Sequence, residues 1–338
     1  MGGSNVEKRI TQADVARVAG ISQALVSYVV NESTVPIPDE TRRRIFAAMD
    51  QLGYVPNVTA RRLRRGKTAT IAGVIPNILN PFYPAFERGI QEVTDEQGYD
   101  LIIYNTDGQR KKEQRCLQSL LQGRVDGVVG VFFHLSALEL LPLLKYQIAL
   151  VRLEATQKRG GELPIDNIFV DNVLAAKDAV RYLIKQGHKR IGMLSSLDGP
   201  AKFRLAGYQQ ALEEAGLEPE NTLIQRESFD ENGGFRAMQK LLSARPTAIF
   251  AANDLMAMGA MMALRQARLR TPEDVAVLGF DDIPAAKLVY PALSSVAQDQ
   301  QALGRRAAEM VFERLSGTLT GPGRTQGVAH QLVLRDSA

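Results

Sequence analysis

The chain has 338 residues, of which 45% are hydrophobic and 23% are charged, with a formal net charge of +4. This length exceeds one ordinary hydrophobic core and predicts two or three domains. No run of about 18 apolar residues suggests a membrane-spanning helix, and no apolar stretch near the start resembles a secretory signal. Cys116 is the only cysteine, so a reducing, cytoplasmic location is expected. Three scattered histidines predict no metal site, and no cofactor is expected.

Residues 11–31 predict a helix, a tight turn and a second helix. Thr11 followed three residues later by Asp14 is typical of a capping box at a helix start. Gly20 supplies the backbone freedom that ends this helix and turns the chain, and Ser22 is suited to cap the next helix. The second helix then carries a buried apolar stripe formed by Leu25, Val26, Val29 and Val30.

This stripe leaves four side chains facing outward near the N-terminal end of the second helix, namely Gln23, Ala24, Ser27 and Tyr28. In helix-turn-helix proteins this end enters the major groove of DNA. Residues 39–52 predict a third amphipathic helix, with Ile45, Ala48, Met49 and Leu52 on one side. An ordinary three-helix packing module without a DNA partner is the alternative, because helix-turn-helix patterns alone also produce false matches.

Positive charge is concentrated in this first part of the chain. Residues 1–67 carry 11 Lys and Arg against 6 Asp and Glu, whereas the remainder carries 30 against 31. A local excess of this kind is the electrostatic footprint of a phosphate-binding surface. A solvated basic face would not explain why the excess coincides with the helix-turn-helix pattern.

After Gly66 short apolar runs of the buried-strand type alternate with amphipathic helices. The predicted strands lie at residues 70–75, 101–104, 128–132, 168–170, 190–194, 248–251 and 275–278. The helices between them include residues 82–97 and 111–122, and a Gly/Pro-containing segment at 158–164 interrupts the alternation. Such alternation predicts doubly wound parallel sheets, and its two successive sets predict two lobes with a cleft between them.

Ordered matches over nearly the whole chain resemble the lactose/galactose repressor (LacI/GalR) family. They include Asp14-Val15-Ala16, Ala19-Gly20-Ile21-Ser22, Leu52-Gly53-Tyr54, Asn80-Pro81-Phe82-Tyr83, Gly187-His188, Gly207-Tyr208, Asn253-Asp254 and Gly279-Phe280-Asp281.

The resemblance implies an all-α helix-turn-helix domain at 1–56, a hinge helix and linker at 57–68, and a two-lobed α/β core of the periplasmic-binding-protein type at 69–338. The N-lobe is expected at about 69–163 and 293–324, and the C-lobe at about 164–292 and 325–338.

For DNA contacts, the resemblance implies base reading by Gln23, Ala24, Ser27 and Tyr28. Tyr28 differs from the arginine of several family members, so the operator sequence stays open. Phosphate contacts are expected from Ser22, Asn31, Arg61, Arg62 and Arg64. Residues 57–63 are too few for a stable isolated helix, and the resemblance implies that they fold only on DNA. In this hinge Asn57, Ala60 and Leu63 would meet the minor groove, with Leu63 as the inserted wedge.

For the cleft, the resemblance implies an effector held by Phe82, Arg204, Phe229, Asn253 and Asp281. Their polar groups and aromatic rings suit a sugar or similar polyol, and the same set could hold a nucleobase. A surface or interlobe salt bridge is the alternative for Arg204 and Asp281. Asp254 is expected to cap a helix, His188 to order a turn, and the methionines at 256, 258, 261 and 262 to pack in the core and a subunit interface.

The sequence therefore predicts a ligand-responsive transcriptional repressor that binds a pseudo-palindromic operator as a homodimer. No tetramer is expected, because no leucine heptad tail follows residues 332–338. A solute-binding protein for transport is one alternative, but it would carry a signal peptide and no basic reading head. An enzyme is the other, but Asp281 and Asp282 are accompanied by no Ser-His-Asp set, metal spacing or phosphate-cradling loop.

Overall fold

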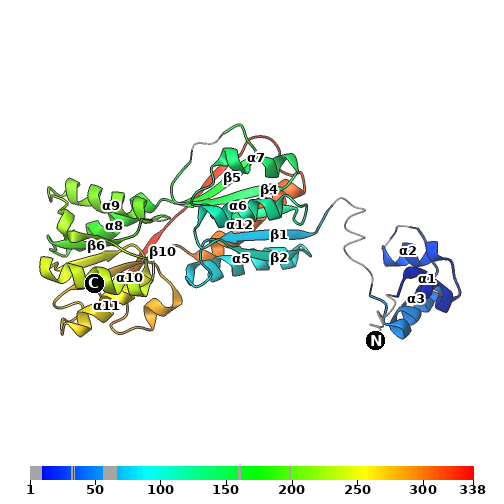
Figure 1. Ribbon diagram of the computed structural model, residues 1–338, viewed down its shortest axis with the longest axis horizontal. Helices are drawn as coiled ribbons and strands as arrows, with labels where there is room; N and C mark the ends of the chain where they lie inside the picture. The colour runs from blue at the N-terminus through cyan, green and yellow to red at the C-terminus, as the bar shows by residue number, and fades with distance from the viewer. Residues whose placement is uncertain (1–9, 32, 34, 56–66, 159–160, 198) are drawn as a thin grey trace, which may run out of the picture. The chain divides into compact units, whose positions relative to one another are not determined.

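The computed structural model describes residues 10–31, 33, 35–55, 67–158, 161–197 and 199–338. The chain divides into two compact units, Met1–Thr68 and Ala69–Ala338 (Figure 1). Each unit has a hydrophobic core of its own. The predicted hinge residues at 57–63 lie outside the described residues.

In its described residues the first unit has three helices, α1 (Gln12–Ala19), α2 (Gln23–Val30) and α3 (Asp39–Leu52). The predicted capping box is confirmed: the Thr11 hydroxyl accepts a hydrogen bond from the Asp14 amide, and the Thr11 amide donates to the Asp14 carboxylate. Gly20 ends α1 in the left-handed region with a φ of 64°, where a residue with a Cβ is disfavoured. The Ser22 hydroxyl caps α2 by accepting from the Leu25 amide.

The three helices enclose a small apolar core. Its buried members are Val15, Ala16, Ala19, Val26, Val29, Val30, Ile37, Ile45 and Ala48.

Within the described residues, no single helix is long and apolar enough to cross a membrane. The pair α1 and α2 passes that test together, but the two helices are bent by 112°.

The N-lobe of the second unit is a six-stranded sheet in the order β11-β5-β4-β3-β1-β2. Its strands are β1 (Thr70–Ile75), β2 (Asp100–Asn105), β3 (Gly127–Gly130), β4 (Ala149–Glu154), β5 (Ile165–Val170) and β11 (Thr325–Val328). Its helices are α5 (Phe82–Glu96), α6 (Arg110–Leu120), α7 (Ala137–Lys145) and α12 (Gln300–Leu315). Ile71 and Ile75 of β1 pack in the cluster that holds α5 and α12, whereas Ala72 and Val74 pack in the cluster with α6 and α7.

The C-lobe is a second six-stranded sheet in the order β12-β10-β9-β8-β6-β7. Its strands are β6 (Ile191–Ser195), β7 (Ile224–Arg226), β8 (Ala248–Ala251), β9 (Ala276–Asp281), β10 (Ser294–Ala297) and β12 (Gln331–Val333). Helices α8 (Asn172–Lys185) and α9 (Ala201–Glu214) cover one face, and α10 (Glu231–Leu241) and α11 (Asp254–Gln266) cover the other (Figure 1). Short 3-10 turns lie at Asn221–Leu223, Leu242–Ala244 and Pro284–Lys287.

The chain crosses between the lobes after β5, after β10 and after β11. The lobe boundaries expected from the sequence, at residues 164, 293 and 325, placed β5 and β11 in the C-lobe and β10 in the N-lobe. The sheet order corrects this: β5 and β11 belong to the N-lobe and β10 to the C-lobe. The physical reason is strand pairing: β5 completes the ladder beside β4, with Leu150 opposite Ile165, and β10 continues the ladder beside β9. Apolar periodicity marks a strand but does not encode its pairing partner.

Candidate functional site

The outward face of α2 carries the side chains that the sequence predicts for base reading. Gln23 and Ala24 are exposed and Ser27 is half-buried, while Tyr28 is 42% exposed. Val26 on the opposite face is fully buried. The packing of α2 therefore presents its N-terminal half to the surroundings, as a recognition helix requires.

The two ends of this helix are held by side chains. Asn31 follows α2 and its Nδ2 donates to the Ser27 carbonyl at 2.7 Å and to the Ser27 hydroxyl at 3.0 Å. Arg44 of α3 donates to the Ala19 carbonyl at 2.6 Å, which anchors the turn between α1 and α2. Arg44 was not identified from the sequence, although a cation beside the C-terminal carbonyls of a helix is a known stabilising device. Of the predicted phosphate contacts, Ser22 and Asn31 lie at the ends of α2, and Arg61, Arg62 and Arg64 lie outside the described residues.

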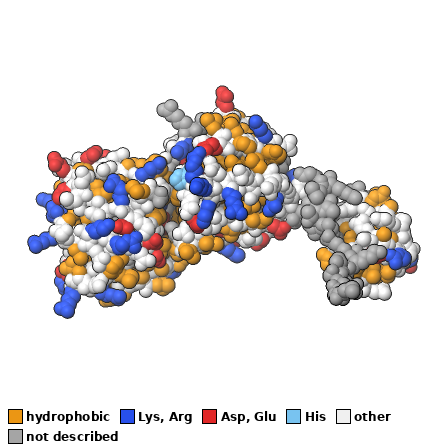
Figure 2. All heavy atoms as spheres, in the orientation of Figure 1, with side chains coloured by type: hydrophobic (Ala, Val, Ile, Leu, Met, Phe, Trp, Pro, Cys, Tyr) orange, Lys and Arg blue, Asp and Glu red, His pale blue; other side chains and the backbone are white. Residues whose placement is uncertain are grey.

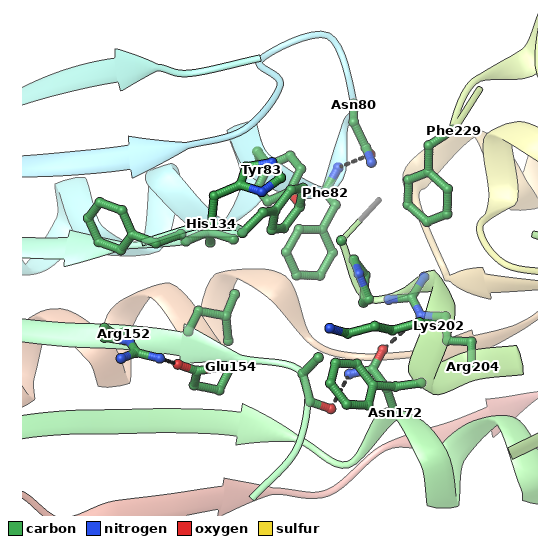
Figure 3. Close-up of a pocket in the computed structure, with 18 of the residues that line it drawn as sticks. Asn80, Phe82, Tyr83, His134, Arg152, Glu154, Asn172, Lys202, Arg204 and Phe229 are labelled. Carbon is green, nitrogen blue, oxygen red and sulfur yellow. Dashed lines mark hydrogen bonds and ion pairs between the residues drawn. The ribbon is translucent and has the colours of Figure 1, made fainter. Parts of the chain in front are cut away.

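A cavity of about 430 Å³ lies between the N-lobe and the C-lobe (Figure 3). This volume is within the roughly 300–1,000 Å³ typical of small-molecule sites. The N-lobe contributes the start of α5, the loop after β3 and the end of β4; the C-lobe contributes the starts of α8 and α9 and the ends of β9 and β10. Ligand sites of doubly wound sheets form at such edges, where strands end and helices begin.

Arg204 organises the C-lobe wall of the cavity and is only 3% exposed. Its Nε donates to Asn172 Oδ1 at 2.7 Å and its Nη2 to Asp281 Oδ1 at 3.2 Å. The guanidinium also lies over the Phe280 ring, 3.6 Å from the centroid. Asp281 Oδ1 accepts a further bond from Gln298 Nε2 at 2.7 Å. These contacts hold donors and acceptors in fixed positions, as recognition of a polyol requires.

Burial sets the electrostatics of this pair. It raises the pKa of the Asp281 carboxyl, and the Arg204 charge acts against that rise. Burial also lowers the pKa of the Arg204 guanidinium, and Asp281 acts against that fall. The salt bridge considered as an alternative role is therefore real, but both partners belong to the C-lobe and both line the cavity.

The N-lobe wall is largely aromatic. Phe82 and Tyr83 of α5 pack edge to face with centroids 5.1 Å apart, and the loop after β3 adds Phe133. That loop is held from behind by Glu113 of α6, whose carboxylate accepts hydrogen bonds from the amides of residues 133, 134 and 135 at 2.8–3.1 Å. Glu113 is fully buried, so the loop is anchored to the interior of the lobe.

The end of β4 brings charge to the same wall. Arg152 and Glu154 are two residues apart on the strand, so they lie on one face of it, and they form an ion pair. Lys158 Nζ lies 3.7 Å from the Glu154 carboxylate. Opposite them, Lys202 of α9 extends into the space between the walls (Figure 3).

Four of the five predicted effector contacts line the cavity, namely Phe82, Arg204, Phe229 and Asp281. Asn253 does not line it: its Oδ1 accepts from the Met256 amide and its Nδ2 donates to the Phe229 carbonyl. The expected capping by Asp254 is wrong, because the cap of α11 is Asn253.

Asp254 has a different structural role. It accepts from the Ser295 hydroxyl at 2.6 Å and the Ile283 amide at 2.8 Å. His188 contacts the Thr247 hydroxyl at 3.1 Å, away from the cavity. Met256 is fully buried in the C-lobe core, whereas Met262 is 52% exposed. Within the described residues no cluster of His, Cys, Asp and Glu is arranged to hold a metal ion.

Sequence reasoning missed Asn172, Arg152, Glu154 and Lys202 among the lining residues. Asn172 lies two residues after the end of β5, beside the helix cap Asp171, and a polar pair just after a buried strand is a readable signal. Arg152 and Glu154 alternate at the end of β4, a strand that the sequence reading passed over. Lys202 carries no comparable signal, because its direction depends on how α9 begins.

Comparison with known proteins supplies the family. Residues 11–57 match the model of bacterial regulatory proteins of the lacI family, and residues 180–338 match that of a periplasmic binding protein-like domain. The chain is 36% identical over 314 residues to the ribose operon repressor of Escherichia coli (strain K12), covering 90% of this chain and 93% of that protein. The chain belongs to the lacI family of bacterial regulatory proteins.

Two solved structures resemble this lacI-family chain over almost its entire length. The transcriptional regulator CelR in complex with cellobiose is 31% identical, with a TM-score of 0.72, covering 98% of this chain and 100% of that one. The lac repressor dimer bound to operator and the anti-inducer ONPF is 25% identical, with a TM-score of 0.85, covering 98% and 99%. The predicted family and fold class are therefore confirmed.

Proposed function

We propose that this lacI-family regulator is a repressor that binds a pseudo-palindromic operator as a homodimer and responds to a polyol bound between its lobes. The observation that carries the proposal is the presence, in one chain, of an exposed recognition-helix face and a polar cavity between two lobes. A solute-binding protein for transport does not need an exposed DNA-recognition helix. An enzyme would need reacting groups, whereas Arg204 and Asp281 are committed to each other.

The polyol assignment rests on the C-lobe wall. Arg204, Asn172, Asp281 and Gln298 are joined in one hydrogen-bonded set that faces aromatic rings across the cavity. Sugars present hydroxyls at their rim and apolar C–H groups on their faces, which match these two walls. Cellobiose in the similar CelR complex has the same chemistry.

The homodimer rests on exposed apolar side chains of the core unit. Ile102 and Ile103 of the edge strand β2 are 41% and 43% exposed, and Tyr290 is 97% exposed. Exposed apolar groups on an edge strand favour pairing with a second copy. The similar lac repressor structure is a dimer.

Light scattering tests the homodimer and should report the mass of a dimer. Ile103→Asp should shift the equilibrium toward the monomer. The control Leu138→Asp, at an exposed leucine of α7, should not.

The experiment that tests the proposal is selection of bound duplexes from a random DNA pool, followed by affinity measurements on the selected site. A symmetric site that exceeds random DNA by about a thousandfold or more is expected. Gln23→Ala should cost about 1–3 kcal/mol of binding free energy if Gln23 pairs with a base. Gln51→Ala, an exposed glutamine of α3, is the matched control and should leave affinity unchanged. Weak binding without sequence preference, both alone and with pools of small molecules, would refute the proposal.

A further inference from the structure

The charged side chains that line the cavity do not balance. Among the described lining residues, four are cationic and two are anionic: Arg152, Lys158, Lys202 and Arg204 against Glu154 and Asp281. Asp281 is engaged by Arg204, and Glu154 is engaged by both Arg152 and Lys158. Among the described lining residues there are therefore more cations than the carboxylates neutralise, an excess that favours an anionic group on the ligand.

Lys202 is the cation that these carboxylates leave without a partner. Its side chain is exposed, and its Nζ lies over the ring of Phe203, 5.0 Å from the ring centroid. Figure 3 shows its side chain extending from α9 into the cavity, between Arg204 on one side and the Arg152–Glu154 pair on the other. A lysine held on an aromatic ring at the mouth of a cavity is placed to meet a ligand anion.

The backbone adds positive potential at the same place. Three helices of the second unit, α5, α8 and α9, begin at the cavity, with Phe82, Asn172 and Pro200 among the lining residues. The amino end of a helix carries a partial positive charge that favours anions. The nearby carboxylates of Glu113 and Asp254 do not line the cavity, and each is engaged by donors of its own.

On the space-filling surface, Lys and Arg side chains lie on both lobes beside their junction (Figure 2). An anionic ligand approaching this junction would be attracted before it makes any contact, and the attraction would weaken as salt is added.

We propose that the effector is an anionic polyol, with a phosphate or carboxylate group at Lys202 and hydroxyls at the Arg204–Asp281–Asn172 set. This inference rests on the proposed sensing of a polyol in the cavity and names the chemical class of that ligand. Arg152 and Lys158, already paired with Glu154, add to the positive potential at the anion end. A neutral sugar would offer Lys202 only hydroxyl oxygens, which accept weaker hydrogen bonds from an ammonium group than a phosphate or a carboxylate does.

The test is calorimetric titration of the full-length protein with matched ligand series. One series is ribose, ribose 5-phosphate and ribonate; the other is glucose, glucose 6-phosphate and gluconate. At least one phosphate or carboxylate should bind roughly 10-fold or more tightly than its neutral parent, as expected for one charge-assisted contact. The phosphate and carboxylate arms distinguish the two sources of the charge. The preference should shrink when salt is raised, because the charges are partly exposed.

Lys202→Met should remove this preference, so that the anionic member and its neutral parent bind the variant with similar affinity. Lys185→Met, at an exposed lysine of α8 outside the cavity, is the matched control and should leave the preference intact. If no anionic member binds more tightly than its neutral parent, or if the preference survives in Lys202→Met, the inference is wrong. If only the neutral sugars bind, the inference of an anionic effector is wrong, whereas the proposed binding of a polyol is supported. If the operator selection fails, the proposed function is wrong whatever the titrations show.

Discussion

Glu87 places an ionisable group in the interior of the N-lobe and is only 4% exposed. It lies on the sheet-facing side of α5, beside Gly73 of β1, where a Cβ atom would be 2.2 Å from Glu87 Oε2. Within the described residues neither carboxyl oxygen has a hydrogen-bond partner. Burial therefore raises the pKa of Glu87 from 4.5 to about 8, so the folded chain keeps a proton here at neutral pH.

This shift makes the stability of the core fall as pH rises. Below pH 4.5 the carboxyl is protonated in both the folded and unfolded states, and it adds no pH dependence. Between pH 4.5 and about 8 the unfolded chain releases the proton and the folded chain retains it. The free energy of unfolding therefore falls by about 1.4 kcal/mol per pH unit in this window. The accumulated loss is about 5 kcal/mol, and above pH 8 it no longer grows.

Replacement of Glu87 by glutamine removes this titration with little change of shape. The free energy of unfolding of Glu87→Gln minus that of the wild type should rise by about 3 kcal/mol between pH 5 and 7. Urea denaturation of the full-length protein at pH 5, 6 and 7 measures this difference. Other buried carboxyls titrate alike in both proteins and cancel. Parallel stability curves for the two proteins would refute the reasoning.

Two further substitutions test how the core unit is held together. Gly259→Ala should lower the free energy of unfolding by about 1–3 kcal/mol, because the added Cβ would lie 2.0 Å from a backbone carbonyl oxygen of α10. The control is Gly161→Ala, where no atom lies within 4 Å of the added Cβ. Equal melting temperatures of the two variants would contradict this prediction. Arg314→Met should cost about 3 kcal/mol, because it removes the two bonds of 2.7 and 3.0 Å that Arg314 donates to the fully buried Asp166. Asp166 then keeps only Arg324, whose amide donates to it at 2.9 Å and whose Nε lies 3.6 Å away. Arg305→Met removes only exposed ion pairs, with Glu92, Glu96 and Glu309, and should cost about 1 kcal/mol or less. Equal losses of stability in the two arginine variants would contradict the greater contribution of the buried Arg314–Asp166 pair.

Local signals in the sequence predicted the first unit well. The capping box at Thr11 and Asp14, the glycine turn at Gly20 and the cap at Ser22 are each decided by a few neighbouring residues, and all three are present. The same held for strands such as Thr70–Ile75, because their apolar runs are continuous. These features need no information from distant parts of the chain.

Features decided by tertiary contacts were not predicted. Adjacent Asn253 and Asp254 are both able to cap a helix, and the backbone conformation at the strand end assigns the cap to Asn253. Glu113 lies on an amphipathic helix like many others, yet it holds a loop about 20 residues away. The lobe of β5 depends on its pairing with β4, which the apolar pattern of a single strand does not contain.

The division of the cavity between the lobes explains how a ligand would control DNA binding. The C-lobe supplies the Arg204 set, while the N-lobe supplies the aromatic wall and the Arg152–Glu154 pair. A ligand that contacts both walls stabilises one placement of the lobes over another, and it can shift their equilibrium only by that difference in affinity. Along the chain, β1 of the N-lobe is the first strand after the helix-turn-helix helices, so we expect a ligand to act on DNA binding through the N-lobe. Lys202 belongs to the C-lobe and Arg152 to the N-lobe, so an anion attracted by both would favour a placement of the lobes that keeps the two cations close to it.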